Sequence, residues 1–514
     1  MPKVVSQNSL ISLLDPGSCL KLLEGMWAFA WYNESNGILL LSRDRFGEKP
    51  LYVWSKNNGL YFASEVKGLA AIANDSPKVN ENHLIRNLVN GYKSLYKTNE
   101  TFFLEVKELP PGTCLKIESN GKSFSSNYWK PKLIENNNLS YSDAVDMTRE
   151  AVINAIKLRM RSDVPIAFCM SGGVDSNSLI SVASKILECE VHGFTIVNTD
   201  ARYEEQSIVD QSVKELGIKH TSVKLNKHNF LKNLRSLINH HDAPVYTISY
   251  YLHWQLMQSI ADKGYKVTIS GTAADELFTG YYDHHNLYLY EVSKNKILYK
   301  KSLDNWNKYQ EKIVRNPYLR DPNLYLKNPK FRDHNFMHND LFASCLKEKW
   351  KESFVETDFT ESLLRNRMLN EMFTETVPVI LHEDDLNAMY FSMENRSPFL
   401  DSTLFDLAYS IPSQFLIKDG RAKAVLRDAM KGIVPDIILE ERRKVGFNAP
   451  ILDLLDLDDY SSESSESNQS TSESSDSSDS EAIADISMED AREHVMKKIR
   501  NKIKKKYVKK VKYQ

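Results

Sequence analysis

The sequence predicts an α/β protein built on a doubly wound, mostly parallel sheet, and three observations support this prediction. Between about residues 140 and 455, apolar runs alternate with amphipathic runs. EVHGFTIV, HTSVKL and YKVTISG have the composition of strands, and YEEQSIVDQSVKELG has the spacing of a helix that ends at Gly217. The apolar run PIAFCM leads into CMSGGVDSNSL at 169–179, which indicates a strand that turns directly into a helix. The expected core face of that helix consists of Leu179, Val182, Ala183 and Ile186.

The turn between this strand and this helix has the composition of an anion-binding site. At the carboxyl end of a parallel strand, a turn into a helix points backbone N–H groups and the positive end of the helix outward. Gly172 and Gly173 lack a Cβ atom and let a ligand approach the backbone, while Ser171 and Ser176 supply hydroxyl groups. Asp175 repels a bare phosphate, so we expect it to bind a Mg²⁺ ion that neutralises one. The turn therefore predicts a site for a magnesium polyphosphate.

Length and composition restrict the class of protein. The 514 residues suffice for two or three domains, and 42% hydrophobic with 26% charged residues is typical of a globular chain. No apolar run approaches the roughly 18 residues of a membrane span, so no membrane partner is expected. The cysteines, which form no CxxC pair and no metal-ligand spacing, are Cys19, Cys114, Cys169, Cys189 and Cys345. We therefore predict reduced thiols and a cytoplasmic protein.

The chain divides into three predicted regions. Residues 1–135 contain short aromatic and branched runs such as MWAFAWY and ILLLSRD, separated by NESNG and KNNG, which predicts a β-rich domain. Residues 136–455 form the α/β domain. Residues 456–514 join a serine-rich acidic segment to a basic end, KKIRNKIKKKYVKKVKYQ, which favours a disordered tail. Such a tail suits a solvated extension, an interaction segment for acidic partners or nucleic acid, or a kinase substrate, and its partner is unknown.

The SGGVDS turn resembles the signature of the PP-loop ATP pyrophosphatases, which cleave ATP between its α- and β-phosphates. A Walker P-loop requires GxxxxGK[ST], and the GKS at Gly121–Ser123 has Lys116 where the first glycine belongs. We therefore expect that GKS to form a hairpin turn. The signature alone leaves open the synthetases of GMP, NAD and argininosuccinate and some tRNA-modifying enzymes.

Further stretches narrow the choice to one family. They are GMWAFAWYNESNGILLLSRDRFGEKPLYV, SGTAADELFTGYYDHH, MENRSPFLD, KAVLRDAM and KVGFNAP. In this order, over roughly residues 22–450, they resemble the glutamine-hydrolysing asparagine synthetases. The resemblance implies a PP-loop ATP pyrophosphatase-type doubly wound parallel sheet at 136–455. It also implies that 1–135 is a partial α+β glutaminase-like domain of the N-terminal-nucleophile class.

The resemblance also implies roles for individual residues. The implied ATP-binding residues are Met170, Ser171, Gly172, Gly173, Asp175, Ser176, Ile196, Ser270 and Gly271, with Met170 and Ile196 flanking the adenosine. Asp175 and Asp275 are the implied Mg²⁺ ligands, because two carboxylates on facing turns can share one ion. The implied catalytic residues are Lys423, Asp275 and Glu276. Lys423 can neutralise charge on the leaving pyrophosphate, and Glu276 can face the amino group of the substrate.

The implied reaction is the ATP-dependent amidation of L-aspartate to L-asparagine through a β-aspartyl-adenylate, with AMP and pyrophosphate as products. One position departs from the family, since many members carry an acidic residue where this chain has Thr272. If that acid helps to deprotonate ammonia, Glu276 or water must take its role here. Two alternatives stay open: amidation or ring closure of another carboxylate on the same scaffold, and a non-catalytic scaffold whose tail is the working part.

The sequence also predicts the source of the ammonia. The chain begins Met1-Pro2-Lys3, and the first segment that resembles the family, LKLLEGMWAFAWY, corresponds to the second half of the glutaminase domain. We read Cys19 as a packing residue rather than as the thiol nucleophile. We therefore predict that this chain uses free ammonia, or ammonia from a separate glutaminase subunit or a homo-oligomer, and that Trp27, Phe29 or Trp31 lies on an uncovered face or edge.

Overall fold

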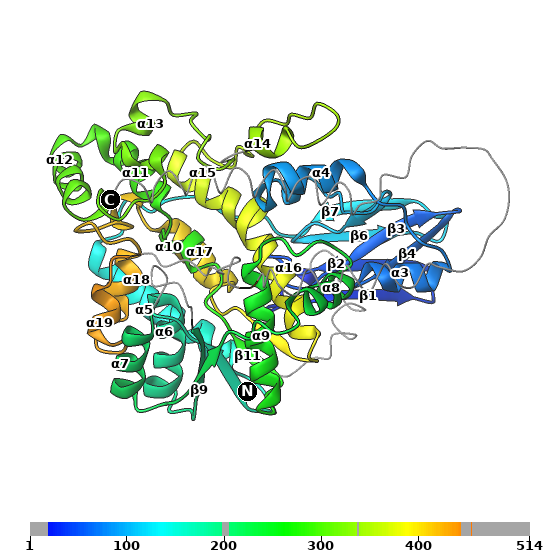
Figure 1. The fold of residues 1–514 in the computed structure, drawn as a ribbon, viewed down its shortest axis with the longest axis horizontal. Helices are drawn as coiled ribbons and strands as arrows, with labels where there is room; N and C mark the ends of the chain where they lie inside the picture. The colour runs from blue at the N-terminus through cyan, green and yellow to red at the C-terminus, as the bar shows by residue number, and fades with distance from the viewer. Residues whose placement is uncertain (1–18, 198–204, 337–338, 444–453, 455–514) are drawn as a thin grey trace, which may run out of the picture. The chain divides into compact units, whose positions relative to one another are not determined.

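The computed structural model of the protein describes residues 19–197, 205–336, 339–443 and residue 454 (Figure 1). Residues 1–337 with 352–455 form one compact unit, and 338–351 with 456–514 form a second. Among the described elements, only α14 (Asn339–Ala343) belongs to the second unit. None of the described helices is both long and apolar enough to cross a membrane. The KVGFNAP stretch and the predicted tail lie outside the described residues.

A five-stranded parallel sheet organises the larger part of the first unit, as the sequence predicted. Its strands are β8 (Ile166–Cys169), β9 (His192–Val197), β10 (Lys219–Lys224), β11 (Val267–Ile269) and β12 (Glu394–Arg396). They lie in the order β10-β9-β8-β11-β12, and every neighbouring pair is parallel. The chain winds from β8 through β9 to β10 and then returns to the other side of β8. The winding direction therefore switches between β8 and β11, and open sheets of this kind bind ligands beyond the carboxyl ends of the strands at such a point.

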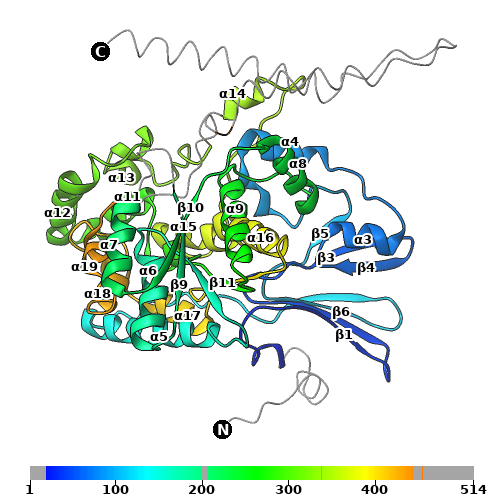
Figure 2. The ribbon, with the colours of Figure 1, turned by 60° about the horizontal axis from the view of Figure 1, so that its bottom comes forward.

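Helices cover both faces of this sheet, because successive side chains of each strand point to opposite sides. Phe168 of β8 is buried in a core that includes Val152, Leu404 and Leu426, from three helices of one face. The neighbouring Ala167 points to the other face, where it is buried with Leu256 and Ala388. The helices of the first face include α5 (Tyr141–Arg159), α6 (Val174–Ser181), α17 (Ser402–Ser410) and α18 (Ala424–Ala429). The second face is covered by α9 (Ser249–Asp262) and α16 (Thr376–Met389), which pack against each other (Figure 2).

Local sequence signals explain where several of these helices begin and end. The side chain of Ser140 accepts a hydrogen bond from the backbone N–H of Asp143 at the start of α5. Asp401 caps α17 in the same way, through the backbone N–H of Leu404. Helix α7 (Gln206–Leu216) ends at Gly217, whose φ of +65° is a conformation that glycine adopts without strain. The predicted helix and its stop are both confirmed.

The predicted β-rich region forms two antiparallel sheets. The first contains β1 (Ala28–Asn33), β2 (Ile38–Arg43), β6 (Thr113–Ile117) and β7 (Ser123–Asn127), in that order. The second contains β4 (Gly59–Ala63), β3 (Tyr52–Lys56) and β5 (Val106–Glu108). The KNNG segment forms the hairpin turn that joins β3 to β4. Asn57 and Asn58 both have positive φ angles, and a turn of this type has a backbone twist that matches the twist of the two strands. Gly121 likewise lies in the hairpin between β6 and β7, where the sequence predicted a turn rather than a P-loop.

The aromatic residues in and just before β1 only partly match the prediction made for them. Among the described strands, β1 pairs with β2 alone and lies at an edge of its sheet. Trp27, Phe29 and Trp31 are nevertheless half-buried, because they pack around a small core that contains Leu20. Cys19 is fully buried, in agreement with its reading as a packing residue.

The structure also corrects one predicted core residue and adds helices that the pattern did not reveal. Ile186 is 43% exposed, because Val182–Ile186 form a π-helical turn that rotates this side chain away from the core. Two helices interrupt the β-rich region, α3 (Val66–Ala73) and α4 (Glu81–Asn90). The other α-helices among the described residues of the first unit are α8 (Phe230–His241), α10 (Ala274–Phe278), α11 (Tyr282–Glu291), α12 (Lys296–Asn305), α13 (Leu324–Lys327), α15 (Leu363–Asn370) and α19 (Asp436–Glu440). The predicted domain boundary near residue 135 stays a prediction.

Candidate functional site

The SGGVDS turn leaves β8 at the switch point and leads into α6. Its backbone is held by its own polar side chains: the N–H of Ser171 donates to Ser176 Oγ at 3.1 Å, and the N–H of Gly173 donates to Ser171 Oγ at 3.2 Å. The side chain of Asn177 donates to the carbonyls of Ser171 and Gly173, each at 2.8 Å. The turn is therefore fixed before any ligand arrives, which lowers the entropic cost of binding.

The turn after β11 packs directly against the SGGVDS turn. A Cβ atom on Gly271 would lie 3.0 Å from the Cβ atom of Asp175 and 3.2 Å from the backbone nitrogen of Ser176. This close approach explains why a glycine stands at 271. Ser270, at the end of the same strand, donates its backbone N–H to the carbonyl of Arg396 in β12. The structure thus brings the two predicted ATP-binding turns together at adjacent strand ends.

Lys423 joins the two predicted metal ligands. Its Nζ atom lies 2.7 and 2.6 Å from the two carboxylate oxygens of Asp175 and 2.5 Å from Asp275 Oδ1. Lys423 has a φ of +57°, in the left-handed region, and its backbone N–H donates to Thr279 Oγ1. Lys423 as a whole is only 5% exposed. One buried ammonium group is therefore shared by two carboxylates that come from different strand ends.

The same arrangement fits a divalent cation. Two carboxylates that meet at one point, as they do around Lys423 Nζ, form an oxygen-rich site of the kind that Mg²⁺ requires. Gly280 helps to fix one of them, since a Cβ atom there would overlap Asp275 Oδ1 at 1.6 Å. The described residues thus fit the predicted magnesium site.

Basic side chains surround the rest of this cavity. It is lined by the SGGVDS turn and Lys423, and also by Arg421, Arg427, Arg442 and Arg443. Arg427 donates to the carbonyls of Ala422, Ile438 and Leu439, and burial lowers its pKa to about 10. An arginine remains charged at that pKa at neutral pH, so the cavity attracts anions such as phosphates.

Glu276 lies one residue beyond Asp275 but in different surroundings. It is 1% exposed, and its Oε1 atom accepts a hydrogen bond of 2.6 Å from the hydroxyl of Tyr281. Burial, together with the nearby Asp275 and Glu371, raises the pKa of Glu276 to about 7. Its predicted role toward the amino group of the substrate stays a prediction.

The two residues predicted to flank the adenosine lie on neighbouring strand ends. Met170 follows β8, is buried, and donates its backbone N–H to the carbonyl of Phe194 in β9. Ile196 is half-buried near the end of β9. A Cβ atom on Gly193 would come within 3.0 Å of Met170 Sδ, so a glycine is required beneath this side chain. The contact of either residue with a nucleotide stays a prediction.

Comparison with known proteins identifies the family of this chain. The asparagine synthase family model matches residues 147–503, which is more than half of the chain. The chain belongs to this family. A glutamine amidotransferase domain model matches residues 14–129, in the predicted β-rich region.

Several curated relatives of this asparagine synthase family member cover most of its length. Asparagine synthetase [glutamine-hydrolyzing] 1 of Bacillus subtilis is 28% identical over 84% of this chain and 68% of its own. A putative asparagine synthetase [glutamine-hydrolyzing] 2 of Methanocaldococcus jannaschii is 26% identical over 64% of this chain and 63% of its own. Amidase chyE of Penicillium rubens is 23% identical over 83% of this chain and 70% of its own. The chain thus spans about two thirds of the length of each relative.

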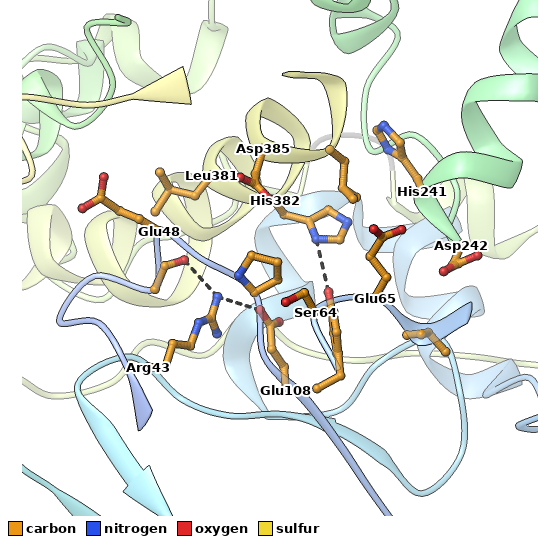
Figure 3. A pocket seen from close by; sticks show the side chains of 15 residues that line it. Arg43, Glu48, Ser64, Glu65, Glu108, His241, Asp242, Leu381, His382 and Asp385 are labelled. Atoms are coloured by element: carbon orange, nitrogen blue, oxygen red, sulfur yellow. Dashed lines mark hydrogen bonds and ion pairs between the residues drawn. The ribbon is translucent and has the colours of Figure 1, made fainter. Parts of the chain in front are cut away.

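This family member has a second charged cavity where the β-rich region meets α8 and α16 (Figure 3). Figure 3 shows Arg43 beside Glu108, and His382 and Asp385 of α16 facing the β-rich region. Arg43 forms an ion pair of 2.7 Å with Glu108, and Lys49 forms one of 2.7 Å with Asp385. We call this space the interface cavity. It lies apart from the SGGVDS turn, and the sequence did not predict it.

Sequence reasoning also missed two groups of buried polar residues. Arg367 of α15 is fully buried among four carboxylates, Asp283, Glu356, Glu371 and Glu375. Asp384 of α16 is 6% exposed beside Thr272 at the end of β11. The signal for the second was the acidic run EDD inside the otherwise apolar helix TVPVILHEDDLNAM, because a charged residue on a buried helix face requires a partner or a function.

Proposed function

We propose that the protein is an AMP-forming ligase that amidates L-aspartate to L-asparagine through a β-aspartyl-adenylate. The observation that carries this proposal is Lys423 Nζ between Asp175 and Asp275, beside the SGGVDS turn. Phosphoryl chemistry requires preorganised positive charge close to the phosphates, and this cavity provides it. The membership of the chain in the asparagine synthase family supports the reaction class.

The reaction has two steps. A carboxylate oxygen of the substrate attacks the α-phosphorus of ATP, and the bond from that phosphorus to the bridging oxygen breaks, which releases pyrophosphate. Ammonia then attacks the acyl carbon of the adenylate, the bond to AMP breaks, and the nitrogen loses a proton to a base. The first step is needed because a free carboxylate has no good leaving group.

The residues of the cavity have distinct roles in this proposal. The backbone of Gly172 and Gly173 admits the phosphates, and Lys423 donates to the pyrophosphate as its charge develops. Asp175 and Asp275 hold Mg²⁺, which when bound neutralises phosphate charge and orients the leaving group. The ammonia source is a separate prediction from the sequence, namely that residues 1–514 use free ammonium.

The test measures pyrophosphate, AMP and asparagine formed from ATP, Mg²⁺ and L-aspartate, with ammonium or glutamine in separate reactions. Because a metal ligand is lost, Asp175→Asn should lower pyrophosphate release by about 100-fold or more. The matched control is Asp262→Asn. Asp262 is exposed at the end of α9, which leads into the amino end of β11, whereas the SGGVDS turn follows the carboxyl end of β8. Equal turnover of Asp175→Asn and the wild-type chain would contradict the metal assignment, and product from glutamine alone would contradict the ammonia prediction.

A second candidate function is amidation of a different carboxylic acid by the same two steps. Thr272, in the turn that carries the implied ATP contacts, favours this candidate, because an acid stands there in many members of the family. One of the relatives is named an amidase. Pyrophosphate release measured across a set of amino and hydroxy acids distinguishes the two candidates. Release with another acid and none with aspartate would replace the first proposal by the second.

A further inference from the structure

One buried carboxylate at the candidate site has no role in the steps above. Asp384 lies on α16, which packs beside β12, and its Oδ2 atom accepts hydrogen bonds from Thr272 Oγ1 at 3.4 Å and from Asn395 Nδ2 at 3.3 Å. Asn395 also donates to Ser270 Oγ at 3.0 Å, and Ser270 Oγ lies 3.1 Å from Thr272 Oγ1. Asp384 is therefore joined to the same turn that supplies two implied ATP contacts.

The surroundings of Asp384 differ from those of an ordinary buried ion pair. Within the part of the chain that the structure describes, no lysine or arginine forms an ion pair with it, and His253 Nε2 lies 3.5 Å from its Oδ1 atom. A buried carboxylate without a strong cation is costly, so its retention requires a compensating function. Burial raises the pKa of Asp384, which makes it a stronger proton acceptor than an exposed aspartate.

The position of Asp384 relative to the phosphate site is also suitable. Thr272 follows Gly271, and Gly271 lies against Asp175 and Ser176 of the SGGVDS turn. Asp384 thus contacts the β11 turn through Thr272, whereas Lys423 contacts Asp175 and Asp275. The other candidate for a base at this turn is Glu276, whose Oε1 atom accepts a hydrogen bond from the hydroxyl of Tyr281 and not from the β11 turn.

We propose that Asp384 is the general base of the amidation step and that Thr272 and Asn395 hold its carboxylate in place. As ammonia forms the new C–N bond, its nitrogen becomes positively charged, and one N–H proton passes to a carboxylate oxygen of Asp384. The bond from the acyl carbon to AMP then breaks, and AMP leaves with the electron pair. No oxidant, reductant or additional reactant is required. The role rests on the proposed function, because it concerns the second step of that reaction.

The test separates the two steps with one substitution. Asp384→Asn should keep aspartate-dependent exchange of pyrophosphate into ATP within about threefold of wild type, because adenylation does not use this base. The same variant should lower amide formation from ammonium by about 100-fold, a typical contribution of a general base. The neighbouring Asp385→Asn is the matched control. It lies on the same helix but pairs with Lys49 at the interface cavity instead of the β11 turn, so the folded variant should change neither step by more than about threefold.

Two further measurements distinguish a base from a packing residue. Hydroxylamine is largely unprotonated at neutral pH and is a stronger nucleophile than ammonia, so Asp384→Asn should form aspartyl hydroxamate at nearly the wild-type rate. In addition, the double variant Thr272→Glu/Asp384→Asn returns a carboxylate to the same turn, and it should raise amide formation at least tenfold above Asp384→Asn alone.

The outcomes that would overturn the proposal are distinct. Normal exchange together with unchanged amide formation in Asp384→Asn overturns this proposal alone, and so does an equal loss of amide and hydroxamate formation. An equal loss of exchange and amide formation assigns Asp384 to the packing of the turn instead. If the wild-type chain itself shows no aspartate-dependent exchange, the proposed function fails, and the base assignment for that reaction fails with it.

Discussion

The cavity at the strand ends and the interface cavity both contain buried charges, but they neutralise them differently. In the interface cavity the pairs are one to one: Arg43 with Glu108, and Lys49 with Asp385. At the strand ends, the single ammonium group of Lys423 serves both Asp175 and Asp275. In such pairs each charge is neutralised by its partner, and the Lys49–Asp385 pair also joins the β-rich region to α16. A shared cation leaves negative charge that a metal ion can neutralise, and this distinguishes the strand-end cavity from the interface cavity.

The strongest test of this comparison removes the shared cation. Lys423→Met should lower pyrophosphate release by about 1000-fold, because preorganised charge at a leaving group is among the largest catalytic contributions. Lys431→Met is the control, since Lys431 is 57% exposed and pairs with Asp428 on the surface. Pyrophosphate release from Lys423→Met within tenfold of wild type would mean that the shared cation is structural, like the pairs of the interface cavity.

A smaller loss of activity is expected when one of the two shared carboxylates is displaced and Lys423 is kept. In Gly280→Ala, the new methyl group would overlap Asp275 Oδ1, so this carboxylate must move away from Lys423. We expect kcat to fall by roughly 10- to 100-fold, the usual consequence of a displacement of about 1 Å at a catalytic group. The control is Gly59→Ala, where the added Cβ atom meets its nearest neighbour at an ordinary 3.4 Å. Steady-state rates equal to those of Gly59→Ala would show that Asp275 need not stay where it is.

The smallest expected effect concerns the stability of the interface cavity. Burial, together with Arg43, lowers the pKa of His382 from 6.5 to about 4. The unfolded chain therefore binds a proton that the folded chain does not between those pH values, so the free energy of unfolding falls as the pH drops below 6.5. His382→Gln should remove about 1.6 kcal/mol of this loss between pH 6.5 and pH 5.

This prediction is checked by urea titrations of both proteins at the two pH values. The exposed His228→Gln serves as the control, because this side chain meets water in the folded and the unfolded chain alike. The prediction fails if acidification lowers the free energy of unfolding equally in the wild type, His382→Gln and His228→Gln. That result would show that the folded protein protonates His382 as easily as the unfolded chain does.

The sequence predicted the strand-end cavity better than its surroundings, for a physical reason. The SGGVDS turn depends on neighbours along the chain, because its serine and asparagine side chains bond to its own backbone. Asp275 and Lys423 could be named only through the family resemblance, since 148 residues separate them and no local pattern brings them together. Asp384 was missed entirely: its partner Thr272 lies 112 residues away, and the contact depends on how α16 packs beside β12. Ile186 was misplaced because hydrophobic spacing assumes a regular α-helix, which the π-helical turn interrupts.

The π-helical turn Glu371–Glu375, which joins α15 to α16, has a consequence for the length of the chain. A π turn holds one more residue than an α turn between the same two helical flanks. It therefore absorbs a residue without rotating the flanks by the roughly 100° that one extra α-helical residue would impose. A version of this chain that is one residue shorter at this turn can form a continuous helix and still direct Asp384 toward β11 and Asp385 toward the interface cavity. By contrast, a one-residue deletion inside α16 ahead of Asp384 would turn both carboxylates by about 100° relative to the preceding turns, so Asp385 would take the direction that Asp384 has now.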